Sequence, residues 1–476
     1  MMVGMSKKSS PGRENPFDVA VIGGGSAGYA AARTAAAAGL KTVVIEGGAE
    51  VGGLCILRGC MPSKALLYTA EVLHLAKMAK TWGIKVPHVG FNFKAVMARK
   101  KAMIDDFAQY RREGLNSGKF KFLRANASFL DPHTVALTGV EGTVPEVVKS
   151  KHFVISSGSV MAPAMVPHLW ETGFLTSDDI LSLKKLPRSL IVLGGGPVAV
   201  ELTQFLARFG VKITLIIRGA QILKEFDAEA AEVVETVLKR DGVEIWKSAT
   251  ITEAFRKGRK KGVSILCGDK PHRLVADEIL HAFGRVPATT GLDLDKAGVE
   301  LENGRIVTNA AMQTSARHIY AAGDCTGPYQ IVHIAVEQGE IAAHNIAHPR
   351  KPRKIDYRLL TSIVFSDPQA AMVGLSEKAA HEKKIRHRAA SYPFNDHGKS
   401  LIMEAKDGFV KLVADPVSGE ILGGTCVGPQ GGELIHEIIA AMHKRMTVRE
   451  LAMMPHYHPT LAEIWTYPAA ELAGLA

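Results

Sequence analysis

Two cysteines, Cys55 and Cys60, have the types and spacing for redox chemistry in the segment GGLCILRGCMPSK. With four residues between them, they could close a small disulfide ring. The segment follows a glycine-rich stretch, VIGGGSAG, and an acidic residue, Glu46, where a bound redox cofactor would present its reactive ring. A disulfide beside a flavin can pass two electrons between a nicotinamide and a thiol. The pair is therefore the first candidate for catalysis.

A zinc site or a structural bridge is the alternative use of two cysteines. Zinc usually takes CxxC-type pairs with a second pair of ligands nearby. The remaining cysteines, Cys267, Cys325 and Cys426, each stand alone. The sequence therefore favours a redox pair and predicts no metal site.

The residues after Cys60 indicate the start of a helix. Pro62 is followed by the apolar run Ala65-Leu66-Leu67, and proline is favoured in a first helical turn, where its missing N–H costs nothing. The partial positive charge of a helix N-terminus stabilises a thiolate. Lys64 adds a cation about one turn along.

A strand, a glycine turn, a helix and a second strand are predicted at residues 17–46. Gly23 permits the tight turn, Gly25 lets the backbone approach a pyrophosphate, and Gly28 lets helix and strand pack closely. Glu46 follows the second strand, at residues 42–45, and could accept hydrogen bonds from a ribose. This pattern predicts a dinucleotide site.

The same unit recurs at residues 189–217, with Gly194 and Gly196 in the turn. A second fingerprint predicts a second dinucleotide site. Its second strand, predicted at 213–217, ends in Ile217, where an NAD site would have an acid. Arg218 follows, and Lys224 lies six residues beyond; both could bind a 2′-phosphate, which favours NADP over NAD. Alternatively, Arg218 is a surface residue and NAD binds through backbone contacts.

Four segments together resemble the class I pyridine nucleotide-disulfide oxidoreductases, a family that includes lipoamide dehydrogenase, glutathione reductase and mercuric reductase. These are GGLCILRGCMPSK, HAFGRVPAT, HIYAAGDCTG and HYHPTLAE. The resemblance extends over nearly the whole chain from residue 17. Leu54 departs from the family's threonine, and Arg58 replaces a small apolar residue within the cysteine loop.

The resemblance implies FAD at the first fingerprint and NAD(P) at the second. It implies that Cys60 faces the flavin and Cys55 exchanges with the substrate. It makes His458 the acid/base and Glu463 the residue that orients its ring, with His458 acting on the other subunit of a homodimer. Further cofactor-binding residues implied by the resemblance are Gly53, Lys64, Gly158, Glu201, Gly284, Arg285, Asp324 and His333.

The expected fold class is α/β, with two Rossmann-type domains and a C-terminal α+β dimerisation domain. Residues 15–160 are expected to form the FAD domain and 161–286 the NAD(P) domain. Residues 287–355 would complete the flavin site, and residues 356–476 would form the dimerisation domain.

Composition sets broad limits on the protein. A chain of 476 residues is too long for one core. No run of 18 apolar residues occurs, and the polar N-terminus, expected to be a disordered leader, has no secretory signal. Few cysteines suit a reducing, cytoplasmic location. The net charge of +11 is dispersed in short clusters, which suggests a solvated surface and makes nucleic acid binding unlikely.

The substrate is less well determined than the chemistry. HYHPTLAE and His333 resemble the lipoamide dehydrogenase group, which normally uses NAD, whereas Arg218 favours NADPH. A dithiol or disulfide, as a small molecule or on a lipoyl domain, is the expected substrate. The alternatives are a glutathione-reductase-like enzyme, a flavin transhydrogenase or quinone reductase, and a nucleic-acid-binding flavoprotein.

Overall fold

The computed structural model describes residues 16–142 and 144–475. The chain divides into two compact units. Unit 1 comprises Met1–Gly53, Ala108–Val160 and Val286–Ile355, and unit 2 comprises Leu54–Phe107, Met161–Arg285 and Asp356–Ala476. The expected leader lies almost entirely outside the described residues.

Unit 1 is built on a sheet whose central strands are parallel. The order is β3-β2-β1-β6, with β18 also beside β6, and β4 and β5 continue from β6 as antiparallel strands. Strand segments such as VAVI of β1 and VVI of β2 are apolar throughout because both faces of a parallel sheet are covered. The strands are β1 (Phe17–Ile22), β2 (Thr42–Ile45), β3 (Lys121–Leu123), β4 (Ala125–Asp131), β5 (Thr134–Gly139), β6 (Val147–Ile155), β16 (Leu301–Glu302), β17 (Arg305–Ile306) and β18 (Ile319–Ala321).

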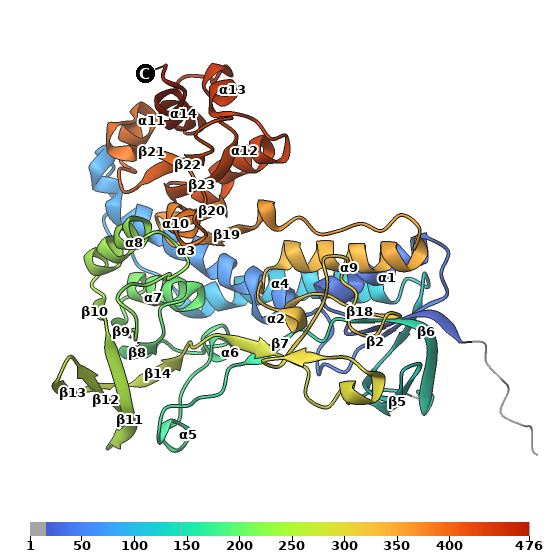
Figure 1. Ribbon diagram of the computed structural model, residues 1–476. Helices are drawn as coiled ribbons and strands as arrows, with labels where there is room; N and C mark the ends of the chain where they lie inside the picture. The colour runs from blue at the N-terminus through green and yellow to red at the C-terminus, as the bar shows by residue number, and fades with distance from the viewer. Residues whose placement is uncertain (1–15, 143, 476) are drawn as a thin grey trace, which may run out of the picture. The chain divides into compact units, whose positions relative to one another are not determined.

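Two helices of unit 1, α1 (Ser26–Ala37) and α9 (Val332–Ala347), run side by side (Figure 1). A Cβ on Gly339 would lie 2.2 Å from the carbonyl oxygen of Ala27, so this approach requires glycine. The pair holds the glycine turn before α1 close to the segment before α9. Two short 3₁₀ helices, η2 (Leu294–Ala297) and η3 (Asp324–Thr326), also belong to this unit.

Unit 2 contains a second parallel sheet, of order β10-β9-β8-β14, beside a three-stranded antiparallel sheet, β11-β12-β13. The strands are β8 (Ser189–Leu193), β9 (Lys212–Ile216), β10 (Glu244–Trp246), β11 (Ala249–Lys257), β12 (Lys260–Cys267), β13 (Lys270–Ala276) and β14 (Glu278–His281). The helices are α2 (Leu54–Arg58), α3 (Cys60–Met78), η1 (Ala79–Trp82), α5 (Leu169–Thr172), α6 (Ser177–Ile180), α7 (Pro197–Arg208) and α8 (Ala228–Arg240). Three elements cross between the units: α4 (Phe93–Leu115), β7 (Ser159–Met161) and β15 (Arg285–Pro287).

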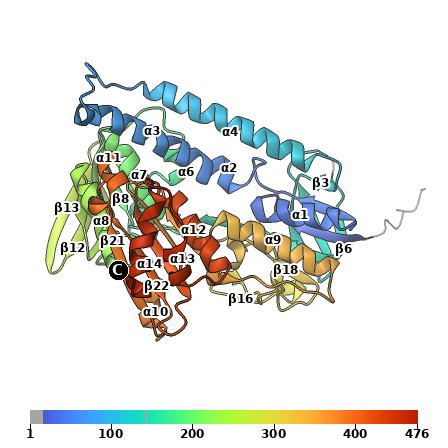
Figure 2. The same cartoon turned by 90° about the horizontal axis from the view of Figure 1, so that it is seen from above.

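The C-terminal part of unit 2 is an antiparallel sheet of order β19-β20-β23-β22-β21. Figure 2 shows α12, α13 and α14 gathered over these strands, where Trp465, Phe394 and Ile438 are fully buried. The strands are β19 (Thr361–Val364), β20 (Gln369–Gly374), β21 (Arg388–Pro393), β22 (Phe409–Ala414) and β23 (Ile421–Gly428). The helices are η4 (Tyr357–Leu359), α10 (Glu377–Glu382), η5 (Phe394–Asp396), α11 (Gly398–Ile402), α12 (Gly431–His443), α13 (Val448–Met453), η6 (Ala462–Trp465) and α14 (Thr466–Ala473).

One hydrophobic cluster joins the parallel and the C-terminal sheets of unit 2. Val364, Ala370 and Val427 are fully buried in the same cluster as Phe205 and Leu206 of α7. The β10-β9-β8-β14 sheet and the C-terminal sheet therefore share a core, which explains why they belong to one unit.

The α/β class predicted from the sequence is confirmed. The strands expected at 17–22, 42–45 and 189–193 have these bounds, whereas the one expected at 213–217 spans 212–216. No helix of the described residues combines the length and apolar character needed to cross a membrane.

Candidate active site

The first glycine turn leads directly from β1 into α1. Gly23 has a φ of +103°, and a Cβ there would lie 2.3 Å from the carbonyl oxygen of Ser156. A Cβ on Gly28 would lie 1.8 Å from the carbonyl oxygen of Gly23. Gly25 caps α1 without a side-chain hydrogen bond. The backbone N–H groups of the first turn are therefore suited to binding a phosphate.

Gly53 faces this turn, and its surroundings show whether a dinucleotide would fit there. Its φ is +77°, and a Cβ on it would lie 2.8 Å from the Cα of Gly25. Two backbone segments thus approach each other with no side chain between them. This is the arrangement that close contact with a pyrophosphate requires, so the residues present fit the cofactor.

Glu46 lies one residue past β2, as the fingerprint predicts. Its Oε2 accepts a hydrogen bond from the Gly24 N–H at 2.7 Å, and its Oε1 accepts one from the Gly48 N–H at 2.6 Å. Arg124 donates to the Glu46 carbonyl oxygen at 2.8 Å and so braces the same loop. Arg124 also borders a cavity of about 390 Å³, whose lining is Val51, Arg112, Asn116, Phe122, Leu123, Arg124, Glu141 and Val144.

Asp324 lies at the same edge of the unit 1 sheet, past the end of β18. Its Oδ2 accepts a hydrogen bond from the Ser159 hydroxyl at 2.6 Å, and the Gly323 N–H donates to the buried Gln338 side chain at 2.7 Å. A Cβ on Gly158 would meet no atom within 4 Å, so the space on that side of the backbone is open. Because β1, β6 and β18 are parallel neighbours, their carboxyl ends bring three separate segments together. His333 lies in the first turn of α9 and is exposed.

The second glycine turn joins β8 to α7 in unit 2. A Cβ on Gly194 would lie 2.4 Å from the carbonyl oxygen of Ala282, just beyond the neighbouring strand β14. Gly196 caps α7, has open space around it, and precedes Pro197 at the first helical position. Gly284 follows β14 at the same edge, also with open space, and Arg285 begins β15.

The residues beyond β9 lie where the ribose of a bound nucleotide would be recognised. Ile217 is buried in the core of unit 2, so it offers no polar group to a ribose. Arg218 is exposed and forms no ion pair with any described residue. The Lys224 ammonium, 86% exposed, lies 3.6 Å from the Glu225 carboxylate. Both cations therefore lie at the surface, beyond the strand that a ribose would face.

The two cysteines flank a break between helices. Cys55 lies in α2, and α3 begins at Cys60 after Gly59, as the sequence predicts. A hydrogen bond from Cys55 lowers the pKa of the Cys60 thiol to about 7; burial opposes this shift and the Lys64 ammonium adds to it. A substantial share of Cys60 is therefore thiolate at neutral pH.

Lys64 is held beside the cysteines by an ion pair. Its ammonium lies 3.0 and 2.8 Å from the two carboxylate oxygens of Glu201 on α7, whose side chain is only 5% exposed. The Phe365 N–H donates to the same carboxylate at 3.0 Å, and the Phe365 ring lies 4.6 Å from the ammonium. The structure thus joins Lys64 and Glu201, separate in sequence, at one point.

His458 and Glu463 form a second candidate pair within unit 2. The Nδ1 of His458 lies 3.1 Å from each carboxylate oxygen of Glu463. The carboxylate is mostly buried, whereas the imidazole is 77% exposed. With Nδ1 held by the carboxylate, Nε2 is the nitrogen that can exchange protons with another molecule.

Two protein-family profiles match this chain and together cover most of its length. The profile described as "Pyridine nucleotide-disulphide oxidoreductase" matches residues 17–339. This chain belongs to the class I pyridine nucleotide-disulfide oxidoreductase family. The profile for the dimerisation domain of the same family matches residues 360–469.

Individual relatives cover almost the whole chain. A protein named dihydrolipoyl dehydrogenase from Bacillus subtilis is 34% identical, covering 94% of this chain and 96% of its own length. One from Chlamydia trachomatis is 35% identical and covers 97% of each chain. Among solved structures, the HOCl-induced flavoprotein disulfide reductase RclA from Escherichia coli, as its Cu(II) complex, has a TM-score of 0.85 and 25% identity, covering 96% of this chain and 100% of its own. This family member is therefore an FAD-dependent disulfide oxidoreductase.

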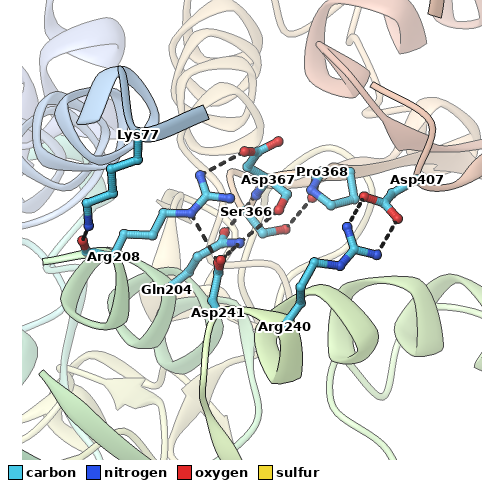
Figure 3. A network of polar contacts seen from close by, with 9 residues as sticks. All are labelled: Lys77, Gln204, Arg208, Arg240, Asp241, Ser366, Asp367, Pro368 and Asp407. Atoms are coloured by element: carbon cyan, nitrogen blue, oxygen red, sulfur yellow. Dashed lines mark hydrogen bonds and ion pairs between the residues drawn. The ribbon is translucent and has the colours of Figure 1, made fainter. Parts of the chain in front are cut away.

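In this disulfide oxidoreductase, the helix that carries Glu201 is fixed further along by an ionic network (Figure 3). The Arg208 guanidinium, 5% exposed, lies 3.1 Å from the Asp241 carboxylate and 2.7 Å from that of Asp367. The Gln204 side chain accepts from the Asp367 N–H at 2.7 Å and donates to its carbonyl oxygen at 2.8 Å. Three turns of α7 therefore bind the loop between β19 and β20.

Replacing Arg208 with leucine should destabilise the protein strongly. The change would leave the buried Asp241 carboxylate without its cation, and breaking a buried ion pair in this way typically costs about 3–5 kcal/mol. Chemical denaturation of the holoenzyme would measure the loss. Arg240→Ala is the matched control, because the Arg240–Asp407 pair is 61% and 39% exposed and such pairs contribute about 0.2–1 kcal/mol. Equal losses in both variants would contradict this account.

Several residues at these sites could not be identified from the sequence. Arg124, Ser159, Gln338 and Phe365 each contact a predicted residue or its loop. Three of these contacts involve a backbone group, which leaves no residue-type pattern in the sequence. Only Ser159, beside Gly158, follows a predicted residue closely enough to have been suspected.

Two further cysteines and one acidic cluster lie in surroundings that do not favour redox or metal chemistry. Cys325 and Cys426 are fully buried, and burial raises the pKa of the Cys325 thiol to about 11, so neither resembles a redox thiol. Asp227, Glu229 and Glu377 lie close enough to hold a metal ion. However, the ammonium of Lys411 lies among them, 2.6 Å from Glu377 and 3.6 Å from Asp227, and already offsets part of their charge.

Proposed function

We propose that this enzyme transfers an electron pair between a nicotinamide and a small dithiol/disulfide, with lipoamide as the substrate that fits best. The arrangement of Cys55 and Cys60 carries the proposal, because one thiol at a helix N-terminus has a pKa near neutrality. The names of the relatives and the HYHPTLAE segment support a lipoyl substrate over glutathione. A substrate carried on a lipoyl domain has the same chemistry.

The bound flavin would relay two electrons between the nicotinamide and the cysteine pair. In the direction of disulfide reduction, the Cys55 thiolate attacks one substrate sulfur, breaking the substrate S–S bond and forming a mixed disulfide. His458 donates a proton to the sulfur that leaves. Cys60 then attacks Cys55, which closes the Cys55–Cys60 disulfide and releases the substrate as a dithiol after a second protonation. Two electrons leave the enzyme thiols and two enter the substrate.

The direct test is an anaerobic titration with NADH and NADPH, followed by assays of the reduced enzyme against lipoamide and glutathione disulfide. Rapid reoxidation by lipoamide is the expected result. A preference for glutathione disulfide would replace the substrate assignment. Turnover with quinones or a second nicotinamide, but with neither disulfide, would reject the thiol mechanism in favour of a transhydrogenase or quinone reductase.

The nicotinamide should be NADPH, which wild type is expected to use at least about tenfold better than NADH in kcat/KM. Arg218 and Lys224 are exposed cations beyond β9, and no acid stands at Ile217 to repel a 2′-phosphate. A charge-assisted hydrogen bond contributes about 1.5–3 kcal/mol, and about 1.4 kcal/mol equals tenfold in affinity. Arg218→Ala combined with Lys224→Ala should remove most of the preference by weakening NADPH alone. A wild-type preference for NADH would contradict the assignment.

We further propose that the enzyme acts as a homodimer. The match to a dimerisation domain supports this, and so does an exposed apolar face on α3 formed by Tyr68, Val72, Leu75 and Met78, which recur at helical spacing. Resemblance to the family implies that His458 serves the cysteines of the partner subunit. Co-expressed Cys60→Ser and His458→Ala chains, each inactive alone, should then regain about a quarter of wild-type activity, since half of the randomly formed dimers have one intact site. No recovery in a mixed dimer would reject the shared site.

A further inference from the structure

His397 lies beside the His458–Glu463 pair and completes a group of three side chains. It is fully buried between η5 and α11. Its Nε2 lies 3.4 Å from the Oε1 of Glu463, and its Nδ1 lies 2.9 Å from the Ser400 hydroxyl. The Glu463 carboxylate therefore has one imidazole, His458, on its exposed side and a second, His397, on its buried side.

The surroundings of His397 determine which ring nitrogen carries the proton. A carboxylate accepts hydrogen bonds and cannot donate one when ionised. A proton on Nε2 would point toward that carboxylate, whereas a proton on Nδ1 would leave a lone pair facing it. The Ser400 hydroxyl can donate to an unprotonated Nδ1. The stable form is thus a neutral ring with its N–H on the side of Glu463, in a contact of 3.4 Å that falls short of hydrogen-bond geometry and leaves Nε2 with no other partner among the described residues.

We propose that His397 is a positioning residue for the acid/base pair, fixing the Glu463 carboxylate and sharing its negative charge with His458. The inference rests on the proposed role of His458 in the dithiol half-reaction. Glu463 is 3.1 Å from the exposed imidazole through both oxygens, so small rotations of the carboxylate would change the interaction with Nδ1. A buried N–H on the opposite side restricts such rotations.

The other polar side chains of this group belong to Tyr467, Tyr392 and Asp396. Tyr467 of α14 faces the ring edge-on, with centroids 6.3 Å apart, and stacks on Tyr392. The Tyr392 hydroxyl donates to the Asp396 carboxylate at 3.0 Å; burial and this hydrogen bond raise the pKa of Tyr392 to about 12. Burial lowers the pKa of His397 itself, and the charge of His458 lowers it further, while Glu463 opposes the shift. Burial therefore favours the neutral ring of His397.

The test compares His397→Leu with His397→Gln in the full-length holoenzyme. Reoxidation of the two-electron-reduced enzyme by lipoamide is followed by stopped flow as a function of pH. Leucine removes the N–H, so Glu463 acts on His458 alone and should raise its pKa. Because His458 donates a proton in this direction, its deprotonation sets the alkaline limb of the rate profile, and this limb should move to higher pH by about one unit. The maximal rate should fall roughly tenfold.

Glutamine places an amide N–H where Nε2 lies, and should restore most of the rate and the wild-type profile. His456→Gln is the matched control. His456 is also a mostly buried histidine paired with a carboxylate, that of Glu437 at 2.6 Å, in the same part of the chain. It should leave the alkaline limb in place. If His397→Leu does not fold, Ser400→Ala, which removes the hydroxyl on Nδ1, should shift the same limb in the same direction.

The outcomes separate the inference from the function on which it rests. If His458→Ala reacts slowly with lipoamide but the His397 and Ser400 variants keep the wild-type limb, or shift it to lower pH, the positioning role is rejected and the proposed function stands. If wild type itself does not react with lipoamide, or His458→Ala reacts as fast as wild type, the proposed function fails first. Lower stability without a shifted limb would make His397 a structural residue only.

Discussion

Replacing His458 with alanine should slow the dithiol–disulfide half-reaction by about 10²–10⁴, the usual range for loss of a positioned acid/base group. Reduction of the enzyme by the nicotinamide should stay nearly normal, because that step uses no proton from His458. Rapid-reaction measurements of the two half-reactions, made separately on the same protein, provide the test. Equal losses in both would show that His458 is structural.

Glu463→Gln should give a smaller loss in the same half-reaction. Glutamine keeps the size of the side chain, but it has no charge to stabilise the imidazolium that forms on His458. The mostly buried carboxylate, 11% exposed, makes that charge effective. A Glu463→Gln enzyme with wild-type rates would mean that the carboxylate only packs against neighbouring residues.

Substitutions of the two cysteines should have opposite effects on the absorbance spectrum of the bound flavin. Cys60→Ser should abolish the long-wavelength charge-transfer absorbance of the two-electron-reduced enzyme and stop disulfide reduction. Cys55→Ser should show such absorbance without any reductant, because Cys60 can then form no disulfide and remains partly thiolate. Absence of the band from Cys55→Ser at neutral pH would overturn the assignment of the two roles.

The pH dependence of that band provides a sharper version of the same test. The Cys60 pKa of about 7 depends first on the hydrogen bond from Cys55, and the ordinary thiol value is 9.0. A lowered pKa means that the thiolate, and so the band, is present above about pH 7 and fades as the pH falls through it. Serine at position 55 can still donate a hydrogen bond, whereas alanine cannot. The midpoint in Cys55→Ala should therefore lie well above that in Cys55→Ser.

Local patterns in the sequence were sufficient to predict the parts of the site that follow local rules. The start of α3 at Cys60 was predictable because Pro62 suits a first helical turn and an apolar run follows it. Both glycine turns were predictable because their closely spaced glycines stand between an apolar strand and a helix, and Gly23 and Gly194 have the positive φ values that such a turn requires. These features depend on a few neighbouring residues, so they are visible in the sequence.

Contacts made by the backbone at long range were not predictable. Phe365 donates its N–H to Glu201, and Arg124 binds the Glu46 carbonyl oxygen, across 164 and 78 positions of the chain. Any residue type except proline has that N–H, and every residue has that carbonyl. His397 is a different case, since its side chain is distinctive but nothing near it in sequence indicates that Glu463 will be its neighbour.

The contacts between α7 and the β19–β20 loop tie the C-terminal segment of the chain to the rest of unit 2. Glu201, Gln204 and Arg208 each hold a group of that loop, and Val364 and Ala370 complete a core shared with α7. A chain cut before residue 356 would expose that core and deprive Glu201 of one of its donors. The C-terminal segment therefore cannot be removed without disturbing the rest of unit 2. Hybrid enzymes made by exchanging this segment between relatives should be active only when the loop and its three partners on α7 are exchanged together.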